Sequence, residues 1–127
     1  DLHSFPTRRS SDLPTVFTKY EMALVSNCID IEVGEGKIKK NYIDLLAPFA
    51  LISSKKREQL LGTLETFVLD SGMNAAKTSE LIGIHINTVK YRLRKINALL
   101  GVEITGNRVI PGLTIAVALK RLEKLMP

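Results

Sequence analysis

Tryptophan is absent from this sequence, cysteine occurs once, and aromatic residues make up only 6% of the chain. A core with so few rings must be built mainly from Leu, Ile, Val and Ala, and that composition favours helices. The single cysteine, Cys28, excludes a disulfide within the chain and fits a reducing, cytoplasmic compartment. Because a lone cysteine most often packs as a small apolar residue, we expect Cys28 to be buried rather than reactive.

Long hydrophobic runs are also missing. The longest, Leu45 to Ile52, is interrupted by Pro48, whereas a membrane-spanning helix needs about 20 apolar residues. No basic-then-apolar leader resembles a signal peptide. The chain lacks a carboxylate pair, a nucleophile beside a base, a phosphate-binding loop and a metal-spaced set of His and Cys. We therefore expect no membrane span, no enzymatic activity, no cofactor and no metal.

The ends of the chain differ in character. Residues 1–13 are polar, have no helical or strand period, and read like the translation of a sequencing adapter. We interpret them as a non-native segment, with a natural disordered linker as the alternative, and do not count Arg8 and Arg9 as DNA contacts. Residues 14–42 are interpreted as the tail of an upstream domain or a linker, and residues 43–127 as the functional domain.

The periodicity of the first half predicts helices with one ambiguous stretch. Residues 17–28 are compatible with a helix. Residues 29–33 alternate like a short strand, although a loop or a helix end fits equally well. Residues 41–50 predict a helix that Pro48 must bend or end. The next helix is expected from Ser54, as its cap, to about Ser71, with Leu60, Leu61, Leu64, Phe67 and Val68 on one face.

The clearest signals lie between residues 74 and 101. Asn74 is a capping residue before a short helix, Ala75 to Ile82, which Gly83 ends. A longer helix is expected from Ile86 to Leu100, ending at Gly101. Two helices joined by a three-residue turn that begins with glycine are the sequence form of a helix-turn-helix. Ser79 is the small residue expected where the two helices cross, and Ile82 and Ile84 are expected to fill the core beneath the turn.

A last helix is predicted from Leu113 to Met126, with a buried seam of Ile115, Leu119, Leu122 and Met126. The expected fold class is therefore all-α: a helical bundle that contains a helix-turn-helix, with a short C-terminal helix packed on it.

The longer helix of the pair has two different faces. At about 100° per residue, Val89, Leu93, Ile96 and Leu100 form an apolar stripe. The opposite side presents an amide, a phenol and cations. Four cations fall within six residues without an acid among them, whereas a merely solvated helix face usually alternates charges. This pattern predicts a DNA-binding surface made by His85, Ile86, Asn87, Thr88, Lys90, Tyr91, Arg92, Arg94 and Lys95.

Several roles within this set stay open. Arg94 is expected to read guanine because its planar fork matches O6 and N7, and Lys90 is equally placed if the helix tilts the other way. Asn87 either reads adenine or stabilises the helix start. His85 either caps the helix or touches DNA, Thr88 is placed for a phosphate, and Tyr91 either packs across the interface or donates to a phosphate.

With these residues in view, the segment from Leu60 to Leu125 resembles the C-terminal helix-turn-helix domain of PucR/CdaR-type regulators, which are bacterial transcription factors. The resemblance rests on four stretches: Leu60-Leu61-x-x-Leu64, His85-Ile-Asn-Thr-Val-Lys-Tyr-Arg-Leu-Arg-Lys-Ile96, Leu99-Leu-Gly-Val102 and Ala118-Leu119. Two departures leave the subfamily open. Gly83 brings the turn nearer to the Fis-type motif, and the loop from Thr105 to Pro111 lacks the acidic residues expected there.

The resemblance implies sequence-specific binding to double-stranded DNA by the C-terminal part of a bacterial transcriptional regulator. A cytoplasmic homodimer on a two-fold related operator is expected, with any effector bound by an upstream domain that is not in this chain. Two alternatives are a Fis-like architectural DNA-binding protein and a helical oligomerisation or protein-interaction module.

Overall fold

The computed structural model describes residues 18–34 and 36–126, so the adapter-like segment lies outside the described residues. Six α-helices, one 3₁₀ helix and one π-helical turn follow one another there, and no strand occurs among these residues. The predicted all-α class is therefore confirmed. The elements are α1 (Lys19–Val33), α2 (Lys37–Ile43), η1 (Asp44–Leu51), α3 (Ser54–Glu65), η2 (Thr66–Asp70), α4 (Ala75–Ile82), α5 (Ile86–Leu100) and α6 (Ile110–Leu125).

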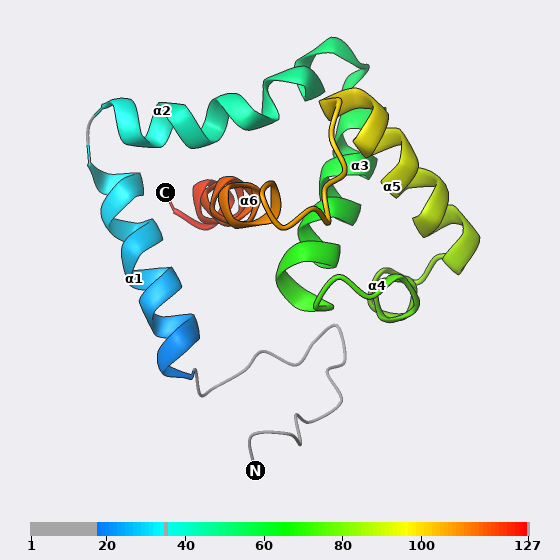
Figure 1. The fold of residues 1–127 in the computed structure, drawn as a ribbon, viewed down its shortest axis with the longest axis horizontal. Helices are drawn as coiled ribbons and strands as arrows, with labels where there is room; N and C mark the ends of the chain where they lie inside the picture. The colour runs from blue at the N-terminus through cyan, green and yellow to red at the C-terminus, as the bar shows by residue number, and fades with distance from the viewer. Residues whose placement is uncertain (1–17, 35, 127) are drawn as a thin grey trace.

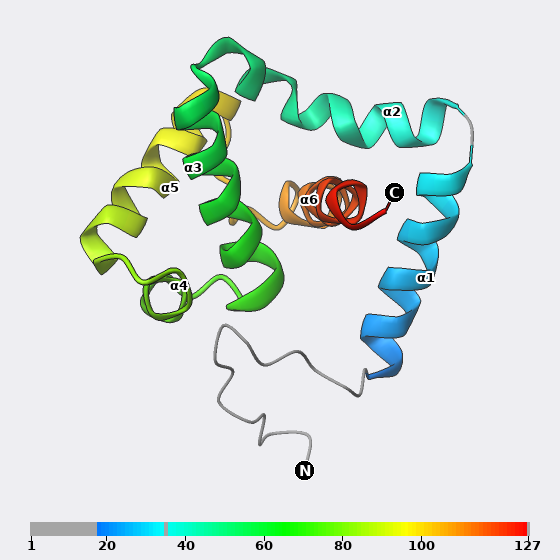
Figure 2. The ribbon, with the colours of Figure 1, turned by 180° about the vertical axis from the view of Figure 1, so that it is seen from behind.

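Helix α6 occupies the middle of the molecule. The α1 and α2 helices lie on one side of it and α3 on the other, while α4 and α5 form the edge beyond α3 (Figure 1). The reverse view shows the same order, with α3 between α5 and α6 (Figure 2). Side chains from five elements and one loop meet in the core, namely Leu46, Phe49, Leu64, Phe67, Ile96, Ile104, Leu113, Ala116 and Val117.

Helix α1 extends through the stretch that the sequence left ambiguous. Residues 29–33 form its last turns, so the strand interpretation is wrong. The alternation of residue types there is not matched by burial, because Ile29 is 41% and Val33 64% exposed. The buried face of α1 is set instead by Cys28, which is 1% exposed as expected. Burial raises the pKa of this thiol, which disfavours the reactive thiolate.

Pro48 changes the type of helix rather than ending it. The expected helix over residues 41–50 begins earlier, at Lys37, and becomes 3₁₀-helical from Asp44 onward, with Pro48 inside. Proline has no N–H to continue the α-helical ladder. In a 3₁₀ helix, side chains three residues apart are aligned, which places both Leu46 and Phe49 in the core.

The helix expected from Ser54 to Ser71 is divided in two. Its cap is Ser53, one residue earlier than expected, and the Ser53 hydroxyl accepts a hydrogen bond from the Lys56 amide at 3.4 Å. From Thr66 to Asp70 the backbone widens into a π-helical turn, where the Ser71 amide donates to the Thr66 carbonyl at 3.0 Å.

Helix α6 starts three residues earlier than predicted, with Pro111 in its first turn, where a missing N–H has no cost. The predicted seam is right at Leu119, which is fully buried, and wrong at Met126, which is 38% exposed. Because elements pack on several sides of α6, its buried residues also include Leu113, Ala116 and Val117, which a single stripe does not contain.

Ion pairs fasten the far end of α6 to η2 and α3. The Arg121 guanidinium donates to both oxygens of Asp70, at 3.0 and 2.6 Å, and to Glu65 Oε1 at 2.6 Å. Lys124 adds a contact to Glu65 Oε2 at 3.1 Å. The hydrogen bonds to Asp70, and then those to Glu65, hold the pKa of Arg121 above its usual range.

Truncation of an aliphatic side chain is expected to lower the free energy of unfolding far more inside the core than on the surface. Ile96→Ala removes a fully buried side chain and is expected to lower the free energy of unfolding by about 2–5 kcal/mol. Leu51→Ala, at a position that is 82% exposed, is the matched control and should change it by less than about 0.5 kcal/mol. Urea denaturation followed by circular dichroism measures both, and similar losses in the two variants would contradict the described core.

Candidate nucleic-acid interface

Helices α4 and α5 have the bounds that the sequence predicts, because each boundary is fixed by a local hydrogen bond. Asn74 Oδ1 accepts from the Lys77 amide at 2.8 Å and starts α4. At its end, Gly83 adopts a left-handed conformation, with φ 80°, and the amides of Gly83 and Ile84 both donate to the Ser79 carbonyl. His85 then caps α5, as its Nδ1 accepts from the Asn87 amide at 3.0 Å.

A pair of buried hydroxyl groups braces α4 from below. Thr78 is fully buried and Ser71 is 5% exposed, and their hydroxyl oxygens lie 2.6 Å apart. Thr78 also donates to the Asn74 carbonyl at 2.8 Å. Ser79, the small residue expected where α4 and α5 cross, is partly buried and donates to the Ala76 carbonyl at 2.8 Å. The sequence analysis did not identify the Ser71–Thr78 contact, which joins α4 to the residue that follows η2.

The inner face of α5 is the predicted apolar stripe. Val89 and Ile96 are fully buried, and Leu93 and Leu100 are partly buried. The helix packs on both α4 and α3. The stripe leaves the opposite face of α5 directed away from the protein.

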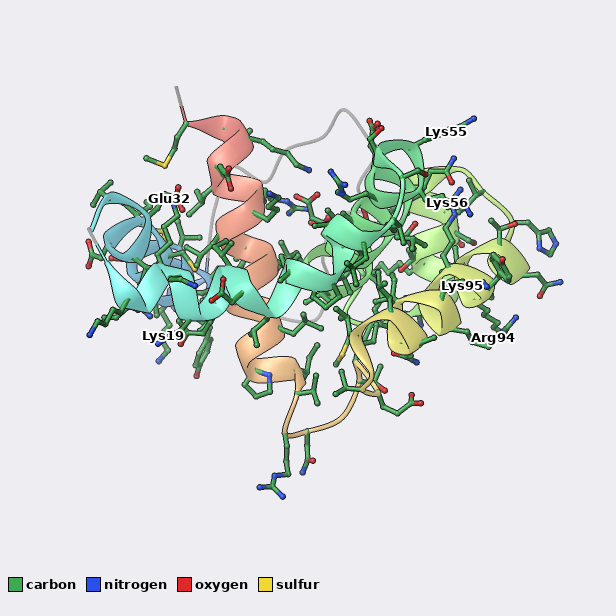
Figure 3. The ribbon with its side chains drawn as sticks, turned by 90° about the horizontal axis from the view of Figure 1, so that it is seen from above. Lys19, Glu32, Lys55, Lys56, Arg94 and Lys95 are labelled. Carbon is green, nitrogen blue, oxygen red and sulfur yellow. The ribbon has the colours of Figure 1, made fainter. Side chains whose placement is uncertain are left out.

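The nine predicted site residues divide into an exposed and a partly buried group. Tyr91 is 52% exposed, and the Lys95 ammonium lies 5.5 Å from the centre of its ring. Arg94 and Lys95 extend from α5 at the outer edge of the molecule (Figure 3). The exposed members are His85, Asn87, Lys90, Tyr91, Arg94 and Lys95, and the partly buried members are Ile86, Thr88 and Arg92.

Arg92 is the member that the structure places differently from the others. Its Nη1 donates to the Thr63 hydroxyl of α3 at 3.2 Å, so part of the guanidinium is used to hold α5 against α3. The Thr63 side chain is buried and donates in turn to the Gln59 carbonyl. Sequence spacing places Arg92 beside the buried stripe but does not reveal this partner.

Asn97 orders the loop beside the predicted DNA-binding surface, and the sequence analysis did not identify it. Its Oδ1 accepts from the Ile104 amide and its Nδ2 donates to Glu103, each at 3.0 Å. These bonds fix the loop after α5, and the loop and helix together form an open depression lined by Arg94, Asn97 and Glu103. In the sequence, the role of Asn97 is indicated only by its position as a polar residue beside the apolar stripe of α5.

The charges of the described residues are segregated. The ion pairs found among residues 18–34 and 36–126 all lie outside α4 and α5. They join α1 to α2 and α2 to η1, occur within α6, or join α6 to α3 and η2. Lys90, Arg94 and Lys95 of α5 form none with these residues. The outer face of α5 thus presents uncompensated positive charge.

A short braced helix, a tight glycine turn and a second helix with an exposed polar and basic face define a helix-turn-helix of the DNA-binding class. The family model described as the PucR C-terminal helix-turn-helix domain matches residues 60–125, slightly more than half of the chain. The chain belongs to this family, as its resemblance had indicated. No curated protein and no solved structure matches it.

Two further features are not found among residues 18–34 and 36–126. No cluster of three or more His, Cys, Asp or Glu side chains suited to a metal ion occurs among these residues. None of the described helices combines the length and apolar character that a membrane crossing requires.

Two glycine substitutions, one in the turn and one inside α3, are expected to change the stability of the fold in opposite directions. Gly83→Ala forces a side chain into a left-handed conformation and is expected to destabilise the fold by about 1 kcal/mol, although the added Cβ meets no atom within 4 Å. Gly62→Ala, in α3 and equally open, should instead stabilise it by about 0.5–1 kcal/mol. Chemical denaturation of both variants tests this, and equal shifts in the same direction would contradict the described turn.

Proposed function

We propose that this chain binds double-stranded DNA sequence-specifically and forms the C-terminal part of a bacterial transcriptional regulator, without enzymatic activity. The observation that carries the proposal is the outer face of α5. Its hydrogen-bonding side chains and cations project from a helix whose opposite side is buried in the core, and Lys90, Arg94 and Lys95 form no ion pair with the described residues. Such a helix fits the major groove, with its N-terminal residues directed at base edges. The proposed contact residues are His85, Ile86, Asn87, Thr88, Lys90, Tyr91, Arg92, Arg94 and Lys95.

The proposed roles follow from chemistry and position. Arg94 reads guanine through two parallel hydrogen bonds, and Asn87 reads adenine through its amide. The free ring nitrogen of His85 and the hydroxyls of Thr88 and Tyr91 contact the backbone. Lys90 and Lys95 neutralise phosphates, and Arg92 reaches a phosphate at the flank while remaining bonded to α3.

Assembly and context belong to the same proposal. One helix contacts few base pairs, so a homodimer on two related half-sites would multiply the specificity. The DNA-binding domain is taken to span residues 43–127. Helix α1 and all of α2 except Ile43 precede it as the end of an upstream part, and both helices contact α6. An effector, where one exists, would bind upstream, and the protein would act in the bacterial cytoplasm.

The proposal predicts DNA binding that weakens steeply with salt. Each neutralised phosphate contributes about −0.9 to the slope of log Kobs against log salt concentration on duplex DNA. Selection from a random duplex library followed by titration at several salt concentrations provides both a preferred sequence and this slope. Absence of any affinity for duplex DNA would contradict the proposal and favour a protein-interaction module.

Arg94 provides the test of base reading. Arg94→Ala is expected to reduce affinity for the selected sequence by about 1–3 kcal/mol and to relax the preference at one base pair. Arg94→Lys is the control because it retains the charge but not the planar fork, so it should keep most of the non-specific binding and lose the preference. If both variants keep the wild-type sequence preference, Arg94 does not read a base.

A further inference from the structure

Two lysines outside the helix-turn-helix share the electrostatic character of α5. Lys55 and Lys56 lie in the first turn of α3, which contains no acidic residue, and both are exposed. Neither forms an ion pair with any residue in the described ranges. Their charges are therefore left to solvent or to a partner.

The position of these lysines is unfavourable for the helix itself. The N-terminal end of a helix carries partial positive charge, so cations in the first turn are repelled. The neighbouring Arg57 has a structural role, because it donates to the carbonyls of Phe49 and Ile52 at 2.9 and 3.1 Å. Among the residues that the structure describes, the side chains of Lys55 and Lys56 form no corresponding hydrogen bond or ion pair.

Both lysines project on the same side of the molecule as the α5 cations. Figure 3 shows Lys55, Lys56, Lys95 and Arg94 along one edge, whereas Lys19 lies at the opposite end. Helices α3 and α5 pack against each other, so the two pairs of cations stand on neighbouring elements. We name Lys55, Lys56, Arg94 and Lys95 the basic edge.

We propose that Lys55 and Lys56 bind phosphates of the DNA backbone beside the groove that α5 occupies, extending the interface onto α3. The inference rests on the proposed function of α5. A DNA strand is the favoured partner because it is a continuous polyanion that follows the whole basic edge. Lysine ammonium groups act as point charges without the planar fork of arginine, so this part of the interface adds affinity and leaves sequence preference unchanged.

The test compares two double variants that lose the same charge at different places. Lys55→Ala/Lys56→Ala removes two cations from the basic edge. Lys19→Ala/Lys37→Ala removes two exposed cations from the starts of α1 and α2 and is the control. Fluorescence anisotropy with the selected duplex and with a random duplex, each about three helical turns long, gives Kd at several salt concentrations.

The basic-edge variant is expected to bind both duplexes about 10- to 50-fold more weakly near 0.1 M salt, with a salt slope shallower by about 1.8. The control should stay within about twofold of the wild type, because charges far from the contact are screened. Equal losses in the two double variants, or no loss at Lys55 and Lys56, would overturn the inference.

The outcome also separates this inference from the proposed function. If the wild-type chain binds duplex DNA and Arg94→Ala weakens that binding while Lys55→Ala/Lys56→Ala does not, only the extension onto α3 is wrong. If the wild-type chain binds neither duplex, the proposed function fails and the extension fails with it. Circular dichroism of both double variants checks that each remains folded, as substitution of exposed lysines predicts.

Discussion

The burial of one side of α5 is the constraint on which the rest of the interface depends. Val89 and Ile96 have no exposed surface, and they lie seven residues apart on the same side of the helix. Turning α5 about its axis by even one residue, about 100°, would expose these side chains and force polar groups into the core. The outward direction of Asn87, Tyr91 and Arg94 is therefore a consequence of hydrophobic packing on the other side.

Burial alone does not fix how α4 supports α5, and here directional bonds contribute. The left-handed Gly83 sends the chain from one helix to the next, while the hydroxyls of Ser71 and Thr78 join α4 to the end of the π-helical turn. Buried polar groups are costly unless they are bonded, so a satisfied pair allows few alternative arrangements. The orientation of the exposed face thus depends on a small polar contact beneath α4 as well as on apolar packing.

The sequence predicted the helix-turn-helix more closely than the surrounding fold, for a physical reason. Asn74, Gly83 and Gly101 act within one turn of their own position, so their effect can be read locally. The burial of Leu46 and Phe49 depends on neighbours distant in the chain, because the core that they enter is completed by α3, η2, α5 and α6. The same holds for the Arg92–Thr63 contact, which joins residues 29 positions apart. Spacing along a helix identifies faces but not the partners of those faces.

The segregation of charge bears on function more directly than the total charge does. Arg121 and Lys124 are committed to Glu65 and Asp70, so these cations hold α6 in place. The cations of α5 make no ion pair within the described ranges, and their mutual repulsion works against folding. A fold that needed them only for solubility would gain from interspersed acids, which α1 and α6 do contain. Their separation on one edge is best explained by a polyanion that supplies the missing negative charge.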